Sequence, residues 1–127
     1  MRLFLVRHAE AAAGDPDELR PLTPGGRGTA REIGARLAAE QPQAVLSSPL
    51  LRARETAVAI AEAAGLDAEA DERLAPGATA DDLRSAAAGR GETVVAVGHQ
   101  PDCSEIVLAL TGREVRFAPG AFHEVHL

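Results

Sequence analysis

A chain of 127 residues makes one domain, and a domain of this size buries about two-thirds of the surface that its unfolded chain exposes. The composition, 46% hydrophobic and 25% charged, is ordinary for a globular protein, and no apolar run approaches the roughly 18 residues of a membrane-spanning helix. A net charge of −6 argues against nucleic acid as the main partner, so any anionic ligand must be attracted by a local cluster of arginines.

The first half of the chain alternates between strand and helix patterns. The run RLFLVR at 2–7 predicts a buried strand. Thr23-Pro24 supplies an N-cap with proline at the first helical position, and the apolar spacing that follows predicts a helix to about residue 41. AVLSS at 44–48 predicts a short second strand, and a helix opened by Ser-Pro is expected over 48–65.

The second half continues this alternation. Residues 66–78 are expected to hold a short strand and then a loop, and the stretch 79–82 resembles a capping box for a helix that ends near Gly89. TVVAVGH at 93–99 is the clearest strand pattern, and a helix opened by Pro101 is expected to follow it, to about residue 110. Two final strands, antiparallel to the others, are expected at 114–117 and 122–127.

Strands that alternate with helices imply an α/β fold. The sequence therefore predicts a single domain over residues 1–127, with a mostly parallel sheet covered by helices on both faces. In such sheets ligands bind beyond the carboxyl ends of the strands. His8 and His99 each follow a predicted strand, Ser47-Ser48 closes another, and Arg52 lies in the first turn of the helix after it. We expect these groups, with Arg7, to meet in one crevice.

The residue types in this cluster favour a phosphoryl ligand. Arg7 and Arg52 offer planar, multidentate donors, and the helix start near Pro49 adds free N–H groups and a positive dipole end. Two imidazoles suit nucleophilic attack and charge stabilisation. The cluster is rich in arginine and poor in carboxylates, so it predicts a phosphate site that needs no metal.

Five stretches of the chain resemble a known family. They are FLVRHAEA (4–11), RPLT (20–23), LSSPLLRARETA (46–57), RLAPG (73–77) and VVAVGHQPD (94–102). In this order they are similar to the histidine phosphatase superfamily, and in particular to the small bacterial phosphohistidine phosphatases of the SixA type. The resemblance implies a phosphoglycerate-mutase-like, three-layer α/β/α domain. The short stretch from Gly65 to Glu92 leaves little material for a large lid.

The resemblance also implies roles for individual residues. His8 would be the nucleophile that becomes phosphorylated, and Arg7, Arg52 and His99 would hold the phosphoryl oxygens. Arg20 would be an outer contact for phosphate or substrate. His8 must be neutral to attack, and we expect the nearby arginines to lower its pKa and a backbone carbonyl to fix its tautomer.

Two positions depart from the family pattern. Ala9 stands where the glycine after the catalytic histidine is usual. Many relatives carry a glutamate general acid a few residues after an Arg-Leu pair, but here Pro76 follows Arg73-Leu74-Ala75 in that place. SixA-type proteins also lack this glutamate, so the departure favours that type.

Other chemically suggestive residues have simpler explanations. Cys103 is expected to be a packing residue, and Glu10 is expected either to orient Arg7 or to donate a proton. Asp15, Asp17 and Glu18 lie in a loop that could rim the pocket, although a solvated loop is expected. The charged face of the first helix, with Arg27, Arg31 and Arg36, is also expected to be solvated, although it could instead dock an acidic protein partner.

The sequence thus predicts a metal-independent phosphatase that needs no cofactor and acts on phosphohistidine in proteins. The alternatives are a phosphatase for small phosphate esters and a catalytically silent phospho-binding module. Residues 1–8 lack a signal-peptide pattern and the single cysteine excludes an internal disulfide, so we expect a cytoplasmic protein. We expect a monomer whose partner is a phosphorylated substrate, with no nucleic acid and no membrane.

Overall fold

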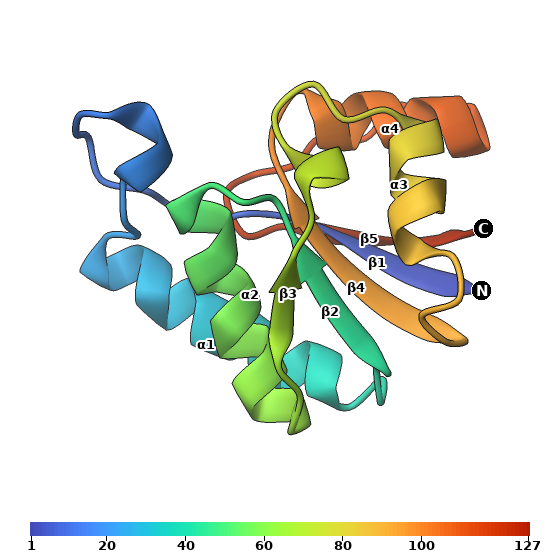
Figure 1. Cartoon of the computed structure of the whole chain (residues 1–127), viewed down its shortest axis with the longest axis horizontal. Helices are drawn as coiled ribbons and strands as arrows, with labels where there is room; N and C mark the ends of the chain where they lie inside the picture. The colour runs from blue at the N-terminus through green and yellow to red at the C-terminus, as the bar shows by residue number, and fades with distance from the viewer.

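The computed structural model describes all 127 residues and has a five-stranded sheet at its centre. The strands lie in the order β3-β2-β4-β1-β5 (Figure 1). Their bounds are β1 Arg2–Arg7, β2 Ala44–Ser47, β3 Ala68–Ala70, β4 Thr93–Gly98 and β5 Phe122–His126. The first four strands pair in parallel, whereas β5 pairs antiparallel with β1. This arrangement confirms the predicted α/β class and the antiparallel last strand.

Four α-helices cover the two faces of the sheet. Helices α1 and α2 pack together on one face, and α3 and α4 lie on the other (Figure 1). Their bounds are α1 Pro24–Ala38, α2 Leu51–Ala64, α3 Ala80–Ala87 and α4 Asp102–Thr111. Two short 3-10 helices, η1 at Asp17–Leu19 and η2 at Glu72–Leu74, lie in the connections. None of the α-helices combines the length and the apolar character that crossing a bilayer requires.

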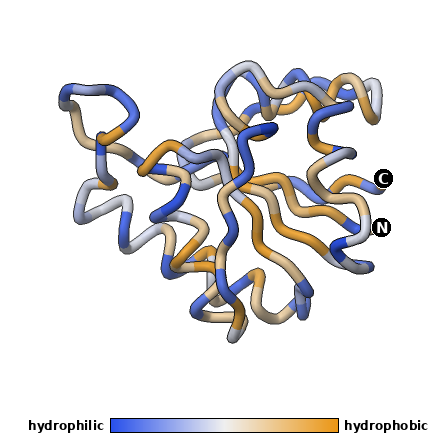
Figure 2. Tube along the Cα trace, in the orientation of Figure 1, coloured by the Kyte–Doolittle hydropathy of each residue, from blue (hydrophilic) through white to orange (hydrophobic).

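The hydrophobic core has two main parts, one on each face of the sheet, because side chains alternate along each strand. In β1, Leu3 and Leu5 point to the α3/α4 side, while Phe4 and Val6 point to the α1/α2 side. All four residues are buried, because side chains on a strand alternate between faces and both faces here are covered. The central strands therefore appear as continuous apolar stretches in Figure 2.

The element boundaries follow the sequence signals with small shifts. The capping box at the start of α3 is formed in both directions between Thr79 and Asp82, as predicted. Helix α2 begins at Leu51 rather than at Ser48, because the Ser48 hydroxyl accepts from the backbone N–H of Leu50 and makes a turn before the helix. Helix α1 ends at Ala38, before the predicted residue 41.

One predicted strand is wrong. Residues 114–117 form no strand, although their pattern favours one. Two of their carbonyl groups accept from side chains instead of from a neighbouring strand: Val115 from the Ser104 hydroxyl at 2.8 Å, and Phe117 from Arg7 at 2.9 Å. Tertiary contacts therefore outweigh the local preference of this segment.

Candidate active site

All five residues predicted for the site line a single cavity of about 380 Å³. Arg7 and His8 come from the end of β1, His99 from the end of β4, and Arg52 from the first turn of α2. Arg20 follows η1. The other lining residues are Glu10, Ala11, Pro76, Gln100 and Pro119. The strand ends therefore bring together groups that lie more than ninety positions apart in the chain.

Backbone hydrogen bonds fix the end of β1. The N–H of His8 donates to the carbonyl of Gly98 at 3.0 Å, which extends the pairing of β1 with β4 by one residue. The N–H of Gly120 donates to the carbonyls of both Arg7 and His8, at 3.0 and 3.1 Å. Gly120 has a φ of +80°, and a Cβ there would approach Thr29 to 2.7 Å, so only glycine suits this position.

The ring of His8 has a defined tautomer. Its Nδ1 lies 2.7 Å from the carbonyl oxygen of Ala9, and a carbonyl can only accept, so Nδ1 carries the proton. In the neutral ring Nε2 then keeps a free lone pair. Burial lowers the pKa of His8, and the charges of Arg52, Arg7 and Arg20 lower it further, against the opposing effect of the Ala9 carbonyl. The arginines therefore lower the pKa of His8, as predicted, and burial, which the sequence did not show, is the larger cause.

His99 is the more deeply buried of the two histidines. Its side chain is 4% exposed, and its Nε2 lies 2.7 Å from the hydroxyl of Ser48 at the end of β2. The rings of His8 and His99 meet edge to face, with their centroids 5.3 Å apart. Burial lowers the pKa of His99 to about 4, with smaller contributions from His8 and Arg52. Both imidazoles are therefore neutral near pH 7.

The two inner arginines present donors to the cavity. Arg7 donates through Nη1 to the carbonyl of Phe117 at 2.9 Å, and Arg52 is 7% exposed. The Nε atoms of both are buried and have no hydrogen-bond partner. Guanidinium groups are strong donors to oxyanions, so a cavity lined by Arg7 and Arg52 favours an anion that can accept from their remaining N–H groups.

Asp17 joins the outer edge of this site, through bonds to two arginines that the sequence did not predict. Its Oδ1 accepts from Arg20 Nε at 2.9 Å, its Oδ2 accepts from Arg52 Nη2 at 3.2 Å, and its carbonyl accepts from Arg52 Nη1 at 2.9 Å. The Asp17 side chain is nevertheless 65% exposed, so it is solvated, as expected, while it contacts two arginines of the site. These bonds, first those to Arg20, lower the pKa of Asp17, so its carboxylate is ionised near neutral pH. In the sequence, the signal for the Asp17–Arg20 contact was an acid three residues before an arginine.

Thr56 supports the site, although the sequence analysis did not identify it. It is fully buried on the inward face of α2, where its hydroxyl donates to the carbonyl of Arg52 at 2.9 Å and accepts from the N–H of Ala9 at 3.1 Å. It thus ties the loop after His8 to the helix that carries Arg52. A polar residue among the apolar positions of a helix face was the available signal.

The remaining candidates divide between the cavity and the core. Pro76 lines the cavity and has no proton to donate. Glu10 also lines it, and its Oε1 accepts from the Thr23 hydroxyl at 2.8 Å. Cys103 is 1% exposed in the core, where burial and then Asp102 raise its thiol pKa to about 12. Cys103 is therefore an inert packing residue, as predicted.

A family model matches the first part of the chain. The model of the histidine phosphatase superfamily (branch 1) matches residues 3–76, which is more than half of the chain. The matched stretch includes His8, Arg20 and Arg52, whereas His99 lies beyond it. No curated protein matches the chain.

Three solved structures are similar over most of the chain. The protein histidine phosphatase SixA complexed with tungstate has a TM-score of 0.85 at 27% identity and covers 100% of this chain and 88% of its own. A protein of Agrobacterium tumefaciens described as a phosphohistidine phosphatase SixA has a TM-score of 0.74 at 31% identity, over 88% and 77% of the two chains. One from Nakamurella, described in the same way, has a TM-score of 0.78 at 26% identity, over 97% and 82%. These likenesses confirm the predicted fold and resemblance.

Proposed function

The chain belongs to the histidine phosphatase superfamily and is a phosphatase, and from that premise we propose that it removes the phosphoryl group from phosphohistidine in proteins, with His8 as the nucleophile. One observation carries the proposal. A neutral histidine with a free Nε2 faces an arginine-lined cavity, and Pro76 lines that cavity where many relatives have a glutamate.

The first step transfers the phosphoryl group to His8. Nε2 attacks phosphorus, the P–N bond of the substrate breaks, and the departing imidazole keeps the electron pair of that bond. The Ala9 carbonyl supports this step because it holds the proton on Nδ1 and stabilises the positive charge that the His8 ring gains. Arg7 and Arg52 donate to the phosphoryl oxygens as negative charge spreads over them.

In this proposal His99 is a hydrogen-bond donor to the same oxygens. Its pKa of about 4 makes it neutral in the empty site, so the arginines supply the positive charge. The Ser48 hydroxyl at 2.7 Å holds the ring in place. In the second step water attacks the phosphorus of phospho-His8, the P–Nε2 bond breaks, and inorganic phosphate leaves. In both steps the arginines stabilise the negative charge on the phosphoryl oxygens, a role that a metal ion has in other phosphatases, and the proposal includes no metal.

The leaving group decides the substrate class. An alkyl ester expels an alkoxide, which needs a proton in the transition state, and Pro76 cannot give one. Imidazole has a conjugate acid with a pKa of about 6.5, so phosphohistidine can take its proton from water beforehand. Asp17 is no substitute acid, since its bonds to Arg20 and Arg52 keep it ionised. The site therefore suits a phosphoramidate better than an alkyl ester.

The test compares kcat/KM for free phosphohistidine, an aryl phosphate and an alkyl phosphate of similar size. Because a general acid is typically worth about 10²–10⁴ in rate, phosphohistidine should exceed the alkyl ester by a factor of that order. If the alkyl ester is the best substrate, the phosphohistidine assignment is wrong. Glu10, which lines the cavity, would then be the acid, and Glu10→Gln should reduce alkyl ester turnover selectively.

A further inference from the structure

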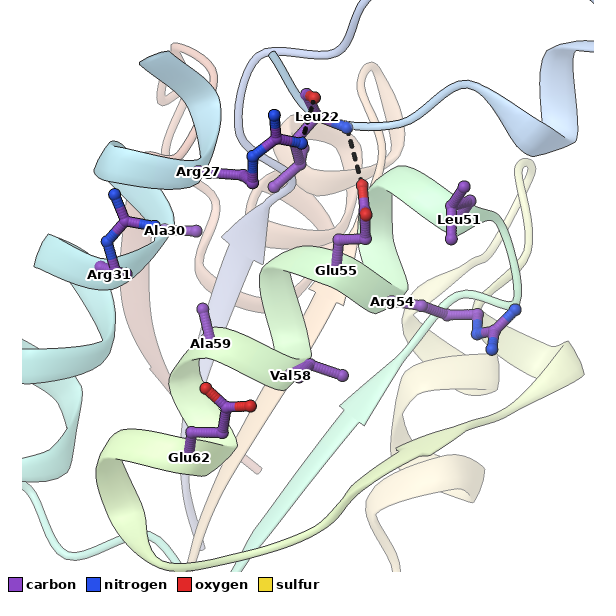
Figure 3. Close-up of a pocket in the computed structure, with 10 residues that line it drawn as sticks. All are labelled: Leu22, Arg27, Ala30, Arg31, Leu51, Arg54, Glu55, Val58, Ala59 and Glu62. Carbon is purple, nitrogen blue, oxygen red and sulfur yellow. Dashed lines mark hydrogen bonds between the residues drawn. The ribbon is translucent and has the colours of Figure 1, made fainter. Parts of the chain in front are cut away.

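A second hollow lies between α1 and α2, outside the site described above. This α1–α2 groove has a volume of about 310 Å³. Figure 3 shows it running along α2, with α1 forming the opposite wall. Its lining residues are Leu22, Arg27, Ala30, Arg31, Leu51, Arg54, Glu55, Val58, Ala59 and Glu62.

The apolar part of the α1–α2 groove suits a helix. Ala30 is fully buried at the base of the groove, and the partly buried Ala59 presents only a methyl group above it, so another helix could approach closely at Ala59. The helices themselves touch nearby, because a Cβ on Gly34 would lie 2.9 Å from the carbonyl of Ala59. Val58 stands at the groove with 45% of its surface exposed, one of three large hydrophobic residues in the chain that are exposed.

The charged residues of the groove are three arginines and two glutamates, which leave a small net positive charge. Of the thirteen arginines, six pair with a carboxylate, and three of the other seven line this groove: Arg27, Arg31 and Arg54. Glu55 is occupied by the backbone N–H of Leu22 at 2.7 Å, and Glu62 lies toward the other end of the groove (Figure 3). The groove is thus net positive in a chain of net charge −6, and Arg31 and Arg54 are exposed and free of a carboxylate, so an acidic segment is favoured beside these two arginines.

The groove also adjoins the candidate active site. Leu22 at its upper end lies two residues after Arg20, and Leu51 directly precedes Arg52. The hydrogen bond from the Leu22 N–H to Glu55 joins the segment after Arg20 to α2 at this end of the groove. Arg36, the third arginine of the predicted basic face, is not part of the groove, since it lies over the ring of Phe122 at 5.0 Å.

We propose that the α1–α2 groove docks an acidic amphipathic helix of the protein whose phosphohistidine enters the cavity, an inference that rests on the proposed function. The apolar face of that helix would lie over Ala59 and Val58. Its acidic residues would meet Arg31 and Arg54, as in other helix-in-groove recognition. The groove would thereby lower KM for a protein substrate and leave the chemical step unchanged.

The experiment uses the full chain and two substrates. One is a helix-bundle domain, phosphorylated with phosphoramidate on a surface histidine that lies beside acidic residues, and the other is free phosphohistidine. The groove variants are Arg31→Glu/Arg54→Glu and Val58→Asp. The matched controls are Arg113→Glu/Arg116→Glu, which changes two exposed arginines that also lack a carboxylate partner, and Leu108→Asp, since Leu108 is 44% exposed.

The expected result is a selective loss. The double groove variant should lose about tenfold or more in kcat/KM on the domain, through KM, and keep its activity on free phosphohistidine. Val58→Asp should lose less, and both controls should match the parent. Added salt should reduce the parent's kcat/KM on the domain and affect the double variant little.

Two results would overturn the docking proposal. One is a groove variant that hydrolyses the domain as well as the parent does. The other is a parent that does not prefer the domain to free phosphohistidine. The proposed function fails by a different result, a preference of the parent for an alkyl phosphate over free phosphohistidine, and no groove variant is needed to see it.

Discussion

The buried neutral state of His99 predicts a specific loss of stability in acid. Its pKa is lowered to about 4 in the folded protein, whereas in the unfolded chain it has the ordinary value of about 6.5. Below pH 6.5 the unfolded chain therefore binds more protons at this residue, and acidification favours unfolding. The stability is fully present above the unfolded pKa and is lost as the pH falls toward 4.

The two pKa values set the size of this loss. For folded and unfolded values of about 4 and 6.5, linkage gives a loss of about 2 kcal/mol at pH 5 and a limit of about 3 kcal/mol at lower pH. His8, whose pKa is also lowered by burial, adds to the parent's acid sensitivity in the same direction. The contribution of His99 must therefore be isolated by a variant.

The assay is urea unfolding of the parent and of His99→Gln at pH 7.5 and pH 5, in buffer free of phosphate. The difference between the two pH values should be smaller in His99→Gln by about 2 kcal/mol. His123→Gln, on β5, is the control and should keep the parent's pH dependence. An equal acid loss in the parent and in His99→Gln, or an NMR titration of His99 near pH 6.5, would refute the reasoning.

Three further predictions concern catalysis. His8→Ala should abolish turnover and the acid-labile phosphoenzyme in rapid-quench experiments, while His126→Ala, at an exposed site, should keep both; normal activity in His8→Ala would rule out His8 as the nucleophile. Arg52→Ala should lose about 2–4 kcal/mol of transition-state stabilisation, read from kcat/KM on an aryl phosphate, whereas Cys103→Ser should stay active. Turnover of the aryl phosphate should persist in EDTA, and full dependence on added Mg²⁺ or Mn²⁺ would exclude the metal-free mechanism.

Local signals were sufficient for most elements of the fold. The run of Leu3 to Val6 encodes a strand buried on both faces, because all four residues are apolar and no polar position alternates with them. The reciprocal hydrogen bonds of Thr79 and Asp82 join residues three positions apart, so the start of α3 is also determined by local sequence. Residues 114–117 show the limit of local prediction, since the carbonyls of Val115 and Phe117 accept hydrogen bonds from side chains distant in the sequence.

The gathering of the principal candidate residues in one cavity was also predictable, and for a physical reason. Parallel strands end at one edge of a sheet, so two strand patterns that end in His8 and His99 suffice to predict that these residues lie close together. The types of these residues, with Arg7 and Arg52, then indicate a phosphoryl ligand. This part of the function is set by local sequence and by a general rule of topology.

Only the tertiary structure decided how these groups are charged and what surrounds them. The pKa of His8 depends first on its burial, which no neighbouring residue in the sequence determines. Asp17 reaches Arg52 across 35 positions, and Arg54 joins Arg31 at one groove only because α1 and α2 pack together. Such contacts depend on how loops and helices pack against the sheet. Packing between segments that are distant in the sequence stabilises them, rather than local conformational preference.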